Sequence, residues 1–398
     1  MVKKYLNESE IFIRNVEKMI GSEEFEKKLK GPKKLRIKYG VDVTAPFLHI
    51  GHAVNLWLMR SFQEEGHKVV FLIGDFTTKI GDPTGKTQTR PKISDADIKK
   101  GTKEFIKQVS KILLTDKKVF EVRKNSEWFS RMKPAQFIEL FSNITHAQII
   151  QRDMFQERIK KGDEIYIHEM LYPIFQGYDS VMIRSDATII GSDQLFNEMM
   201  GRNLQKIFGQ DPQTIITTKI TPGIHGGPKQ SKSLDNYVAI EDSAENKFGK
   251  IMSLPDDLII QYLETYTTMP SAEIEKNKKE LEDKKINPMS VKKELAREII
   301  KRYHSKKEVL KAEEFFKKTF QEKKLPQETP SKKIDSSKPI IYVLHEIGLT
   351  RSISDSRRLI NSGAVEFEGE IIKDPRHKLI TQGVLRVGKK KFVKIIPK

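Results

Sequence analysis

The sequence predicts an α/β protein in three parts: a parallel-sheet domain, an α-helical domain and a small basic C-terminal unit. Residues 35–41 and 68–74 read as apolar strands and flank a helical segment at 51–65. A strand–helix–strand unit of this spacing implies parallel strands joined by a right-handed crossover. Residues 240–323 show helical patterns broken by prolines. Residues 331–398 carry 15 Lys and Arg against 7 Asp and Glu, so this segment is disproportionately basic.

The remaining elements follow from the same periodicities. We expect a helix over 8–30, helices through much of 93–170, strands near 180–184 and at 214–220, and a helix over 194–208. The predicted divisions are a sheet domain over 1–235, a helical domain over 236–325, a linker over 326–338 and a small domain over 339–398.

Composition limits the classes of function. Among 398 residues, Lys and Arg exceed Asp and Glu by 18, which favours a polyanionic partner, with nucleic acid ahead of a membrane. A solvated lysine-rich surface is the alternative. The absence of cysteine excludes disulfides, thiolate catalysis and cysteine-based zinc sites. Residues 1–19 lack a signal-peptide core and no apolar run approaches the roughly 18 residues that span a bilayer, so a cytoplasmic protein without membrane contact is expected.

Two histidines stand between a predicted strand and a predicted helix, in His49-Ile50-Gly51-His52. Their imidazoles can donate to an anion at the helix N-terminus, where free backbone N–H groups also favour negative charge. Gly51 leaves space for a flat ligand to approach the backbone. Incidental histidines and a metal site remain alternatives, although no cysteine or third ligand stands close.

Two lysines, Lys229 and Lys232, lie in Lys-Gln-Ser-Lys-Ser after a glycine-rich stretch. On a flexible loop they suit the β- and γ-phosphates of a nucleotide. A solvated lysine loop is the alternative. The stretch from Gly81 to Lys86 lacks the spacing of a P-loop, so we reject a P-loop NTPase.

Three polar residues share one face of a predicted helix. Tyr172, Gln176 and Asp179 stand at positions i, i+4 and i+7, which places them on the same side. Ordinary surface polar residues are the alternative.

Together these motifs resemble a known family. The histidine motif and the lysine loop, about 180 residues apart, are similar to the HIGH and KMSKS signatures of class I aminoacyl-tRNA synthetases. The Tyr172, Gln176 and Asp179 face resembles the substrate helix of bacterial-type tyrosyl-tRNA synthetases. The resemblance covers nearly the whole chain. It implies a Rossmann-like catalytic domain, an α-helical anticodon-binding domain and a small α+β RNA-binding domain of ribosomal-protein type.

The resemblance also implies substrates and partners: L-tyrosine, ATP with Mg²⁺, and tRNA(Tyr), bound by a homodimer. It implies no zinc and no organic cofactor. Its implied catalytic residues are His49, His52, Lys229 and Lys232. The implied ATP-binding residues are Asp42, Thr44, Gly51, Lys86, Arg90, Asp193 and Lys232. The implied tyrosine-binding residues are Asp82, Tyr172, Gln176, Asp179 and Gln194, with Asp179 reading the phenol hydroxyl.

The basic C-terminal unit resembles a small RNA-binding domain first seen in a ribosomal protein. A short helix carries Arg357 and Arg358, and a strand follows at Val365. The side chains that could contact phosphates are Arg351, Arg357, Arg358, Lys373 and Arg376. A basic end that only helps solubility is the alternative.

Three positions depart from the family pattern. The sequence reads Asp42-Val43-Thr44 where the family usually has Asp-Pro-Thr, and Gln230 stands where Met is common. Lys38 stands where some members carry a tyrosine that shares the phenol hydroxyl, so the second partner of that hydroxyl stays open. The rival interpretations are a tryptophanyl enzyme, an RNA-binding protein that has kept the fold without catalysis, and a nucleotidyltransferase of another kind.

Overall fold

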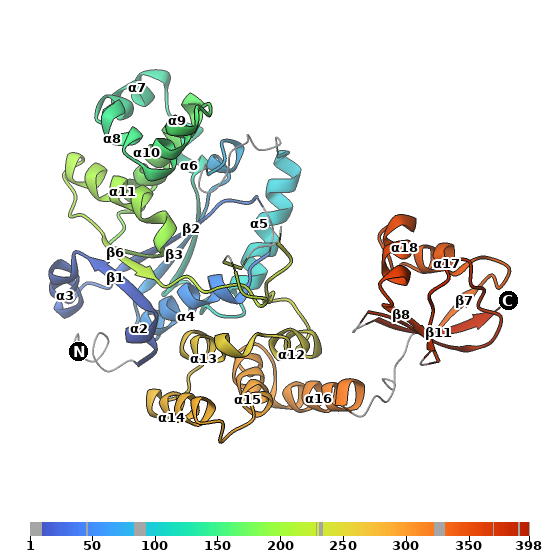
Figure 1. Cartoon of the computed structure of the whole chain (residues 1–398). Coiled ribbons are helices and arrows are strands. Elements are labelled where there is room, and N and C mark those ends of the chain that lie inside the picture. The colour runs from blue at the N-terminus through green and yellow to red at the C-terminus, as the bar shows by residue number, and fades with distance from the viewer. Residues whose placement is uncertain are drawn as a thin grey trace. The chain divides into compact units, whose positions relative to one another are not determined.

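The computed structural model describes residues 10–44, 47–82, 93–227, 229–230, 234–321, 331–368, 370–388 and 391–397. The chain divides into two compact units, Met1–Ala312 and Glu313–Lys398, which are described separately (Figure 1). Within the described residues, no helix is long and apolar enough to cross a membrane.

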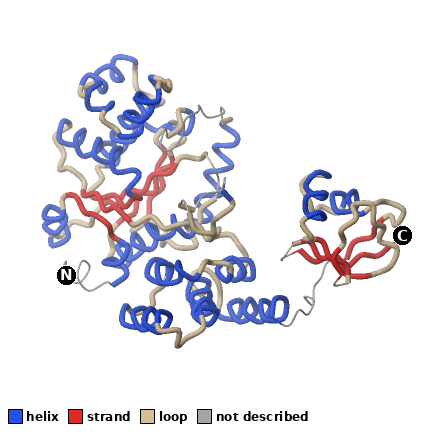
Figure 2. The backbone as a smooth tube through the Cα atoms, viewed as in Figure 1, coloured by secondary structure: helices blue, strands red, loops and turns tan. Residues whose placement is uncertain are grey.

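The first unit is built on a six-stranded sheet in the order β1-β6-β5-β2-β3-β4 (Figure 2). The strands are β1 (Val16–Ile20), β2 (Arg36–Val41), β3 (Lys68–Ile73), β4 (Phe120–Lys124), β5 (Ala187–Gly191) and β6 (Thr214–Thr218). Strands β2 to β6 run parallel, and β1 is antiparallel to β6. The predicted parallel sheet is confirmed, including the strands at 35–41, 68–74 and 214–220.

The strand order reverses at the centre of this sheet. From β2 the chain winds outward through β3 and β4, whereas β5 and β6 lie on the other side of β2. In open α/β sheets, ligands bind at the carboxyl ends of the strands beside such a reversal. Helix α4 (Ile50–Glu64) joins β2 to β3, as predicted, and begins at this edge. Leu56, Met59 and Phe62 of this helix belong to the same buried core cluster as Phe71 of β3.

Helices connect the remaining strands of the sheet. They are α5 (Asp95–Val109), α6 (Ser126–Phe129), α7 (Pro134–Ser142), α8 (His146–Ile150), α9 (Asp153–Lys161), α10 (Ile167–Ile183) and α11 (Leu195–Ile207). Two short 3₁₀ turns, η1 (Thr77–Lys79) and η2 (Ser192–Gln194), follow β3 and β5. Helices α10 and α11 pack closely because Gly177 has no side chain: a Cβ there would lie 2.9 Å from Met200 Cγ and 3.0 Å from the Gly201 nitrogen.

The predicted helix over 8–30 is wrong. The described part of that segment forms α2 (Glu10–Asn15), β1 and α3 (Ser22–Lys30). Gly21 interrupts the helical pattern with a left-handed φ of 83°. Met19 and Ile20 pair with Ile216 and Ile215 of β6, so cross-strand pairing overrides the local helical spacing.

The predicted strand near 180–184 is also wrong. Its apolar residues form the last turn of α10, which ends where Arg184 adopts a left-handed φ of 52°. The strand comes slightly later, as β5, and is buried between β2 and β6. The helices expected through 93–170 are present, but β4 lies among them and was not predicted.

A helical layer completes the first unit. It comprises α12 (Ala244–Met252), η4 (Asp256–Leu258), α13 (Ile259–Tyr266), α14 (Ser271–Glu282), α15 (Pro288–Ile300) and the first part of α16 (Lys306–Phe316). A π-helical turn, η5 (Lys317–Gln321), follows α16. Helix α13 contacts α2 and α4, so the helical segment packs against the sheet domain within one compact unit.

The second unit carries a five-stranded sheet in the order β7-β11-β10-β8-β9. Its elements are β7 (Ser331–Ile334), α17 (Ile340–Glu346), α18 (Ile353–Asn361), β8 (Val365–Phe367), β9 (Glu370–Ile371), β10 (Gly383–Val387) and β11 (Lys391–Pro397). The short helix followed by a strand at Val365 is confirmed. Within the segment expected as a linker, over 326–338, Ser331–Ile334 forms β7 and pairs in parallel with β11.

Candidate active site

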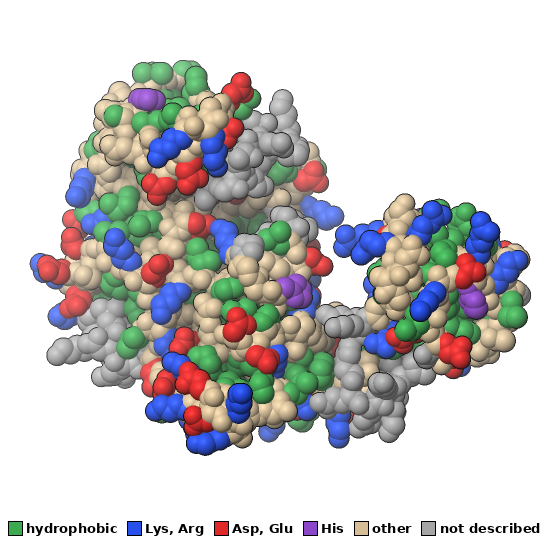
Figure 3. All heavy atoms as spheres, in the orientation of Figure 1, with side chains coloured by type: hydrophobic (Ala, Val, Ile, Leu, Met, Phe, Trp, Pro, Cys, Tyr) green, Lys and Arg blue, Asp and Glu red, His purple; other side chains and the backbone are tan. Residues whose placement is uncertain are grey.

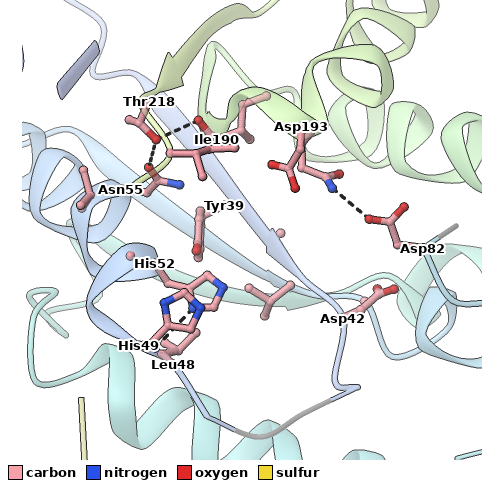
Figure 4. A pocket seen from close by; sticks show the side chains of 18 of the residues that line it. Tyr39, Asp42, Leu48, His49, His52, Asn55, Asp82, Ile190, Asp193 and Thr218 are labelled. Carbon is pink, nitrogen blue, oxygen red and sulfur yellow. Dashed lines mark hydrogen bonds between the residues drawn. The ribbon is translucent and has the colours of Figure 1, made fainter. Parts of the chain in front are cut away.

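A cavity of about 530 Å³ opens at the carboxyl edge of the first sheet, where the strand order reverses. The loops that follow β2, β3, β5 and β6 supply its walls together with α4 and α10 (Figure 4). The structure brings together twelve of the residues predicted for the site: Asp42, Thr44, Gly51, His49, His52, Asp82, Tyr172, Gln176, Asp179, Asp193, Gln194 and Lys229.

Three predicted residues, Lys86, Arg90 and Lys232, lie outside the described residues.

The rings of the two histidines lie against each other, tilted, at the start of α4. Their ring centroids lie 3.8 Å apart with an interplanar angle of 32°. The backbone N–H of His49 donates to Nδ1 of His52 at 3.3 Å, which leaves Nε2 of His52 to carry the proton. Gly51 is required here, since a Cβ at this position would lie 2.9 Å from Nδ1 of His49. The glycine therefore leaves room for the His49 ring.

Both imidazoles are neutral at physiological pH. Burial is the main cause that lowers the pKa of His49 to about 2 and that of His52 to about 4, and Lys229 lowers both further. A neutral imidazole still offers one N–H. The pair can therefore donate hydrogen bonds to an anion without bringing a positive charge of its own.

Asp42 links two elements of the site. It follows β2, and its carboxylate accepts a hydrogen bond from the Thr77 hydroxyl at 2.8 Å and from the Tyr172 hydroxyl at 3.0 Å. Burial raises the pKa of Tyr172 well above its usual value, and the nearby carboxylates of Asp42 and Asp82 raise it further. Tyr172 therefore stays a hydrogen-bond donor.

Asp179 is buried at the base of the cavity, with 3% of its surface exposed. Trp128 Nε1 donates to one carboxylate oxygen at 3.0 Å, and Asn125 Nδ2 donates to the other at 3.3 Å. Burial raises the pKa of Asp179 to about 8, even though Lys38 and the two donors act in the opposite direction. Asn125 and Trp128 escaped prediction because both follow β4, the strand that the sequence did not reveal.

A chain of side-chain amides crosses the site. Gln194 donates to Asp82 at 2.9 Å, and Asn197 donates to both Gln194 and Gln176, at 3.0 and 2.8 Å. Gln176 in turn donates to Glu198 at 3.0 Å. Three of the residues that the resemblance implies for tyrosine binding, Asp82, Gln176 and Gln194, therefore belong to one hydrogen-bonded network. Asn197 and Glu198, which also belong to it, were not predicted.

Lys229 also lines the cavity. Its ammonium forms an ion pair with Asp193 at 2.7 Å, and the side chains are 54% and 30% exposed. An exposed pair of this kind is weak, at roughly 0–1 kcal/mol. The contact is therefore easily exchanged for a contact with a ligand phosphate.

Gln230, the residue where Met is common, has a definite partner. It is buried, and its amide donates to the Tyr266 hydroxyl of α13 at 2.9 Å. Its carbonyl accepts from the backbone N–H of Val238 at 3.4 Å. The position next to Lys229 is thus tied to the helical layer by a polar contact that an apolar side chain does not make.

No group of three or more His, Asp or Glu side chains arranged to hold a metal occurs among the described residues.

The five basic residues predicted to contact RNA lie on the surface of the second unit: Arg351, Arg357, Arg358, Lys373 and Arg376. Figure 3 shows Lys and Arg side chains on the visible face of this unit. Arg358 pairs with Asp355 at 2.6 Å. Among the described residues, the side chains of the other four form no ion pair.

These features agree with comparisons against known proteins. A family model described as tRNA synthetases class I (W and Y) matches residues 30–321. The chain therefore belongs to the class I tRNA synthetases of this family. Solved structures support the fold: a mitochondrial tyrosyl-tRNA synthetase of Aspergillus nidulans, C-terminally truncated, has a TM-score of 0.63 at 21% identity, covering 80% of this chain and 94% of that one.

Full-length relatives identify the branch of the family. A protein of Thermotoga maritima named tyrosine–tRNA ligase is 44% identical over 387 residues, 97% of this chain and 96% of the relative. One of Francisella tularensis with the same name is 42% identical over 393 residues, 98% of each chain. The chain thus falls in the bacterial-type tyrosyl branch, and the predicted resemblance is confirmed. Nothing in these matches favours the tryptophanyl alternative.

Proposed function

We propose that this chain is a tyrosine–tRNA ligase, which activates L-tyrosine with ATP and transfers it to the 3′ end of tRNA(Tyr). One observation supports this most directly: a single cavity holds the histidine pair, Lys229 and the buried Asp179. A triphosphate and a phenol therefore have complementary groups within one site.

In the first step the tyrosine carboxylate attacks the α-phosphate of ATP, and pyrophosphate leaves. In the second step the terminal ribose hydroxyl of the tRNA attacks tyrosyl-adenylate, and AMP leaves. Neither step needs a side-chain nucleophile, so the protein contributes positioning and electrostatic stabilisation. This agrees with a chain that contains no cysteine.

The histidine pair would donate to the α-phosphate oxygens as charge develops there. Because both rings are neutral, they can bind these oxygens without holding the product adenylate by a strong ionic contact. Lys229 and Lys232, with Lys86 and Arg90, would bind the pyrophosphate. Asp193, the present partner of Lys229, would bind the ribose of ATP. Arrival of ATP therefore separates this ion pair and provides a new partner for each side chain.

Asp179 would distinguish tyrosine from phenylalanine. Phenylalanine lacks the hydroxyl, so it would leave a buried polar group without its partner, which costs free energy. Tyr172, Gln176 and Asp82 would hold the substrate ammonium, and Gln194 would face the tyrosine. The hydrogen-bonded network that joins Gln176, Asp82 and Gln194 supports this assignment.

We further propose that Mg²⁺ arrives with ATP and is held mainly by the phosphates, as is usual for this ion. The enzyme is proposed to act as a homodimer in the cytoplasm, where translation takes place. Helices α12 to α16 would contact the anticodon. The second unit would bind tRNA phosphates through Arg351, Arg357, Arg358, Lys373 and Arg376.

The decisive experiment is ATP–pyrophosphate exchange with each of the twenty amino acids. Only tyrosine should support exchange by the wild-type enzyme, and Asp179→Ala should nearly abolish it while ATP still binds. Exchange with tryptophan instead would show that the protein is a tryptophanyl enzyme. Absence of exchange with every amino acid would leave RNA binding without catalysis as the function.

The role of the second unit needs a separate measurement. Arg357→Gln with Lys373→Gln should weaken tRNA charging and reduce its dependence on salt, while pyrophosphate exchange keeps its rate. Unchanged charging by this variant would remove the two residues from the tRNA interface.

A further inference from the structure

A buried ion pair adjoins Gln176, one of the residues proposed to hold the ammonium. Lys38 of β2 and Glu198 of α11 meet at 2.8 Å, with side chains only 1% and 3% exposed. Both residues line the cavity. The sequence left Lys38 without a function, and the proposed reaction uses neither residue.

The contacts of this pair are numerous and short. Lys38 also donates to the Ser180 hydroxyl at 2.7 Å. Glu198 Oε2 receives a second hydrogen bond, from Gln213 Nε2 at 2.7 Å. The surrounding helices are shaped to hold this group, since a Cβ on Gly201 would lie 2.7 Å from the Ser180 hydroxyl and 2.9 Å from Gln213 Nε2. A buried charge needs such partners to be tolerated.

The remaining oxygen of Glu198 faces the site. Oε1 accepts from Gln176 Nε2 at 3.0 Å. An ion-paired carboxylate only accepts hydrogen bonds, so Gln176 must present its NH₂ group to Glu198. If the amide were flipped, two oxygens would lie about 3 Å apart in a buried environment and repel each other. Glu198 therefore fixes which way the Gln176 amide points.

That orientation decides what Gln176 can bind. With Nε2 held by Glu198, the Gln176 oxygen points to the other side, where it accepts from Asn197 at 2.8 Å. An oxygen is the group that a substrate ammonium needs, whereas an NH₂ group would repel it. We propose that Glu198, held in place by Lys38, is a positioning residue that sets the Gln176 amide for the ammonium of tyrosine. This inference rests on the proposed function and deepens it.

The test separates the effect of the hydrogen-bond acceptor that Glu198 offers to Gln176 from the effect of the ion pair with Lys38. Lys38→Met with Glu198→Gln removes both charges but keeps a carbonyl oxygen for Gln176. Lys38→Met with Glu198→Leu removes the charges and the acceptor. In tyrosine-dependent pyrophosphate exchange, KM for tyrosine should be about tenfold higher in the leucine variant than in the glutamine variant, the effect of about 1.4 kcal/mol. Both variants lack Lys38, whose charge lowers the pKa of Asp179, so that change is common to both and cancels in the comparison. KM for ATP should be unchanged in both.

A double-mutant cycle identifies Gln176 as the intermediary. When Gln176→Ala is added, the difference between the leucine and glutamine variants should disappear. A persistent difference would overturn the proposal, as would equal increases of KM for tyrosine and ATP. Arg158→Met with Glu169→Gln provides a matched control, because this pair is also buried, at 2.9 Å, but lies outside the cavity lining. It should leave KM for tyrosine unchanged.

Glu198→Asp supplies a further measurement should the double variants unfold. It keeps the charge beside Lys38 but withdraws the carboxylate from Gln176 by one methylene, so KM for tyrosine should again rise while KM for ATP stays the same. A wild-type KM for tyrosine would overturn the positioning role. Failure of the proposed function is distinguishable, since it would appear as absent tyrosine-dependent exchange in the wild-type enzyme.

Discussion

The ionisation of Asp179 predicts how tyrosine activation depends on pH. Its carboxyl group is buried and has a pKa of about 8 in the empty site. A carboxylate is a stronger acceptor for the phenol hydroxyl than the neutral acid, because charge-assisted hydrogen bonds are roughly twice as strong. We therefore expect the ionised form of Asp179 to be the form that binds tyrosine.

The magnitude follows from the titration. With a pKa of about 8, roughly 9% of the free enzyme carries an ionised Asp179 at pH 7 and roughly 91% at pH 9. Because kcat/KM reports groups of the free enzyme, kcat/KM for tyrosine should rise about tenfold between these pH values. Asp179→Asn removes the titrating group, so its kcat/KM should be lower and should lack this rise.

The assay is tyrosine-dependent pyrophosphate exchange at subsaturating tyrosine and saturating ATP. The amino group of tyrosine also titrates in this range, and so do other groups of the enzyme. The ratio of wild-type to Asp179→Asn activity at each pH cancels these contributions. A ratio that rises about tenfold and levels off above pH 9 supports the reasoning. A ratio independent of pH would refute it.

Three further outcomes are expected. Because burial raises the folded-state pKa of Asp179 above its unfolded value of 3.8, the unfolded protein releases this proton first, so the contribution of Asp179 to stability should fall from pH 4 to pH 8. His49 and His52 act in the opposite direction below pH 6.5, so the measurement is the free energy of unfolding of the wild type minus that of Asp179→Asn, and this difference should fall over the range. Lys229→Ala should lower kcat by roughly 10²–10³ with KM for tyrosine unchanged, whereas Lys111→Ala, which breaks a similarly exposed pair outside the cavity lining, should leave kcat unchanged in the same assay. Gly51→Ala should displace the His49 ring and lower kcat at least tenfold without lowering the melting temperature by more than a few degrees; a wild-type kcat would contradict the proposed contact.

The sequence predicted three of the four strands that lie inside the sheet, β2, β3 and β6, and misplaced the fourth, β5. Strand β3 reads as a nearly continuous apolar run because helices cover both sides of a parallel sheet, whereas in β2 the apolar residues alternate with Arg36 and Lys38. Strands β1 and β4 lie at the two edges of the same sheet and carry charged residues, so their local patterns resemble helix or loop. Pairing with a neighbouring strand makes them strands, and local periodicity does not record that pairing.

The same contrast between local sequence patterns and long-range contacts applies to the residues of the site. His49, His52 and the Tyr172, Gln176 and Asp179 face were predictable because each group is defined by short spacing in the sequence. Lys38 and Glu198 are 160 positions apart and meet only because β2 and α11 converge in the folded protein. Local spacing carries no information on such a pair, whose existence depends on the packing of α10 against α11.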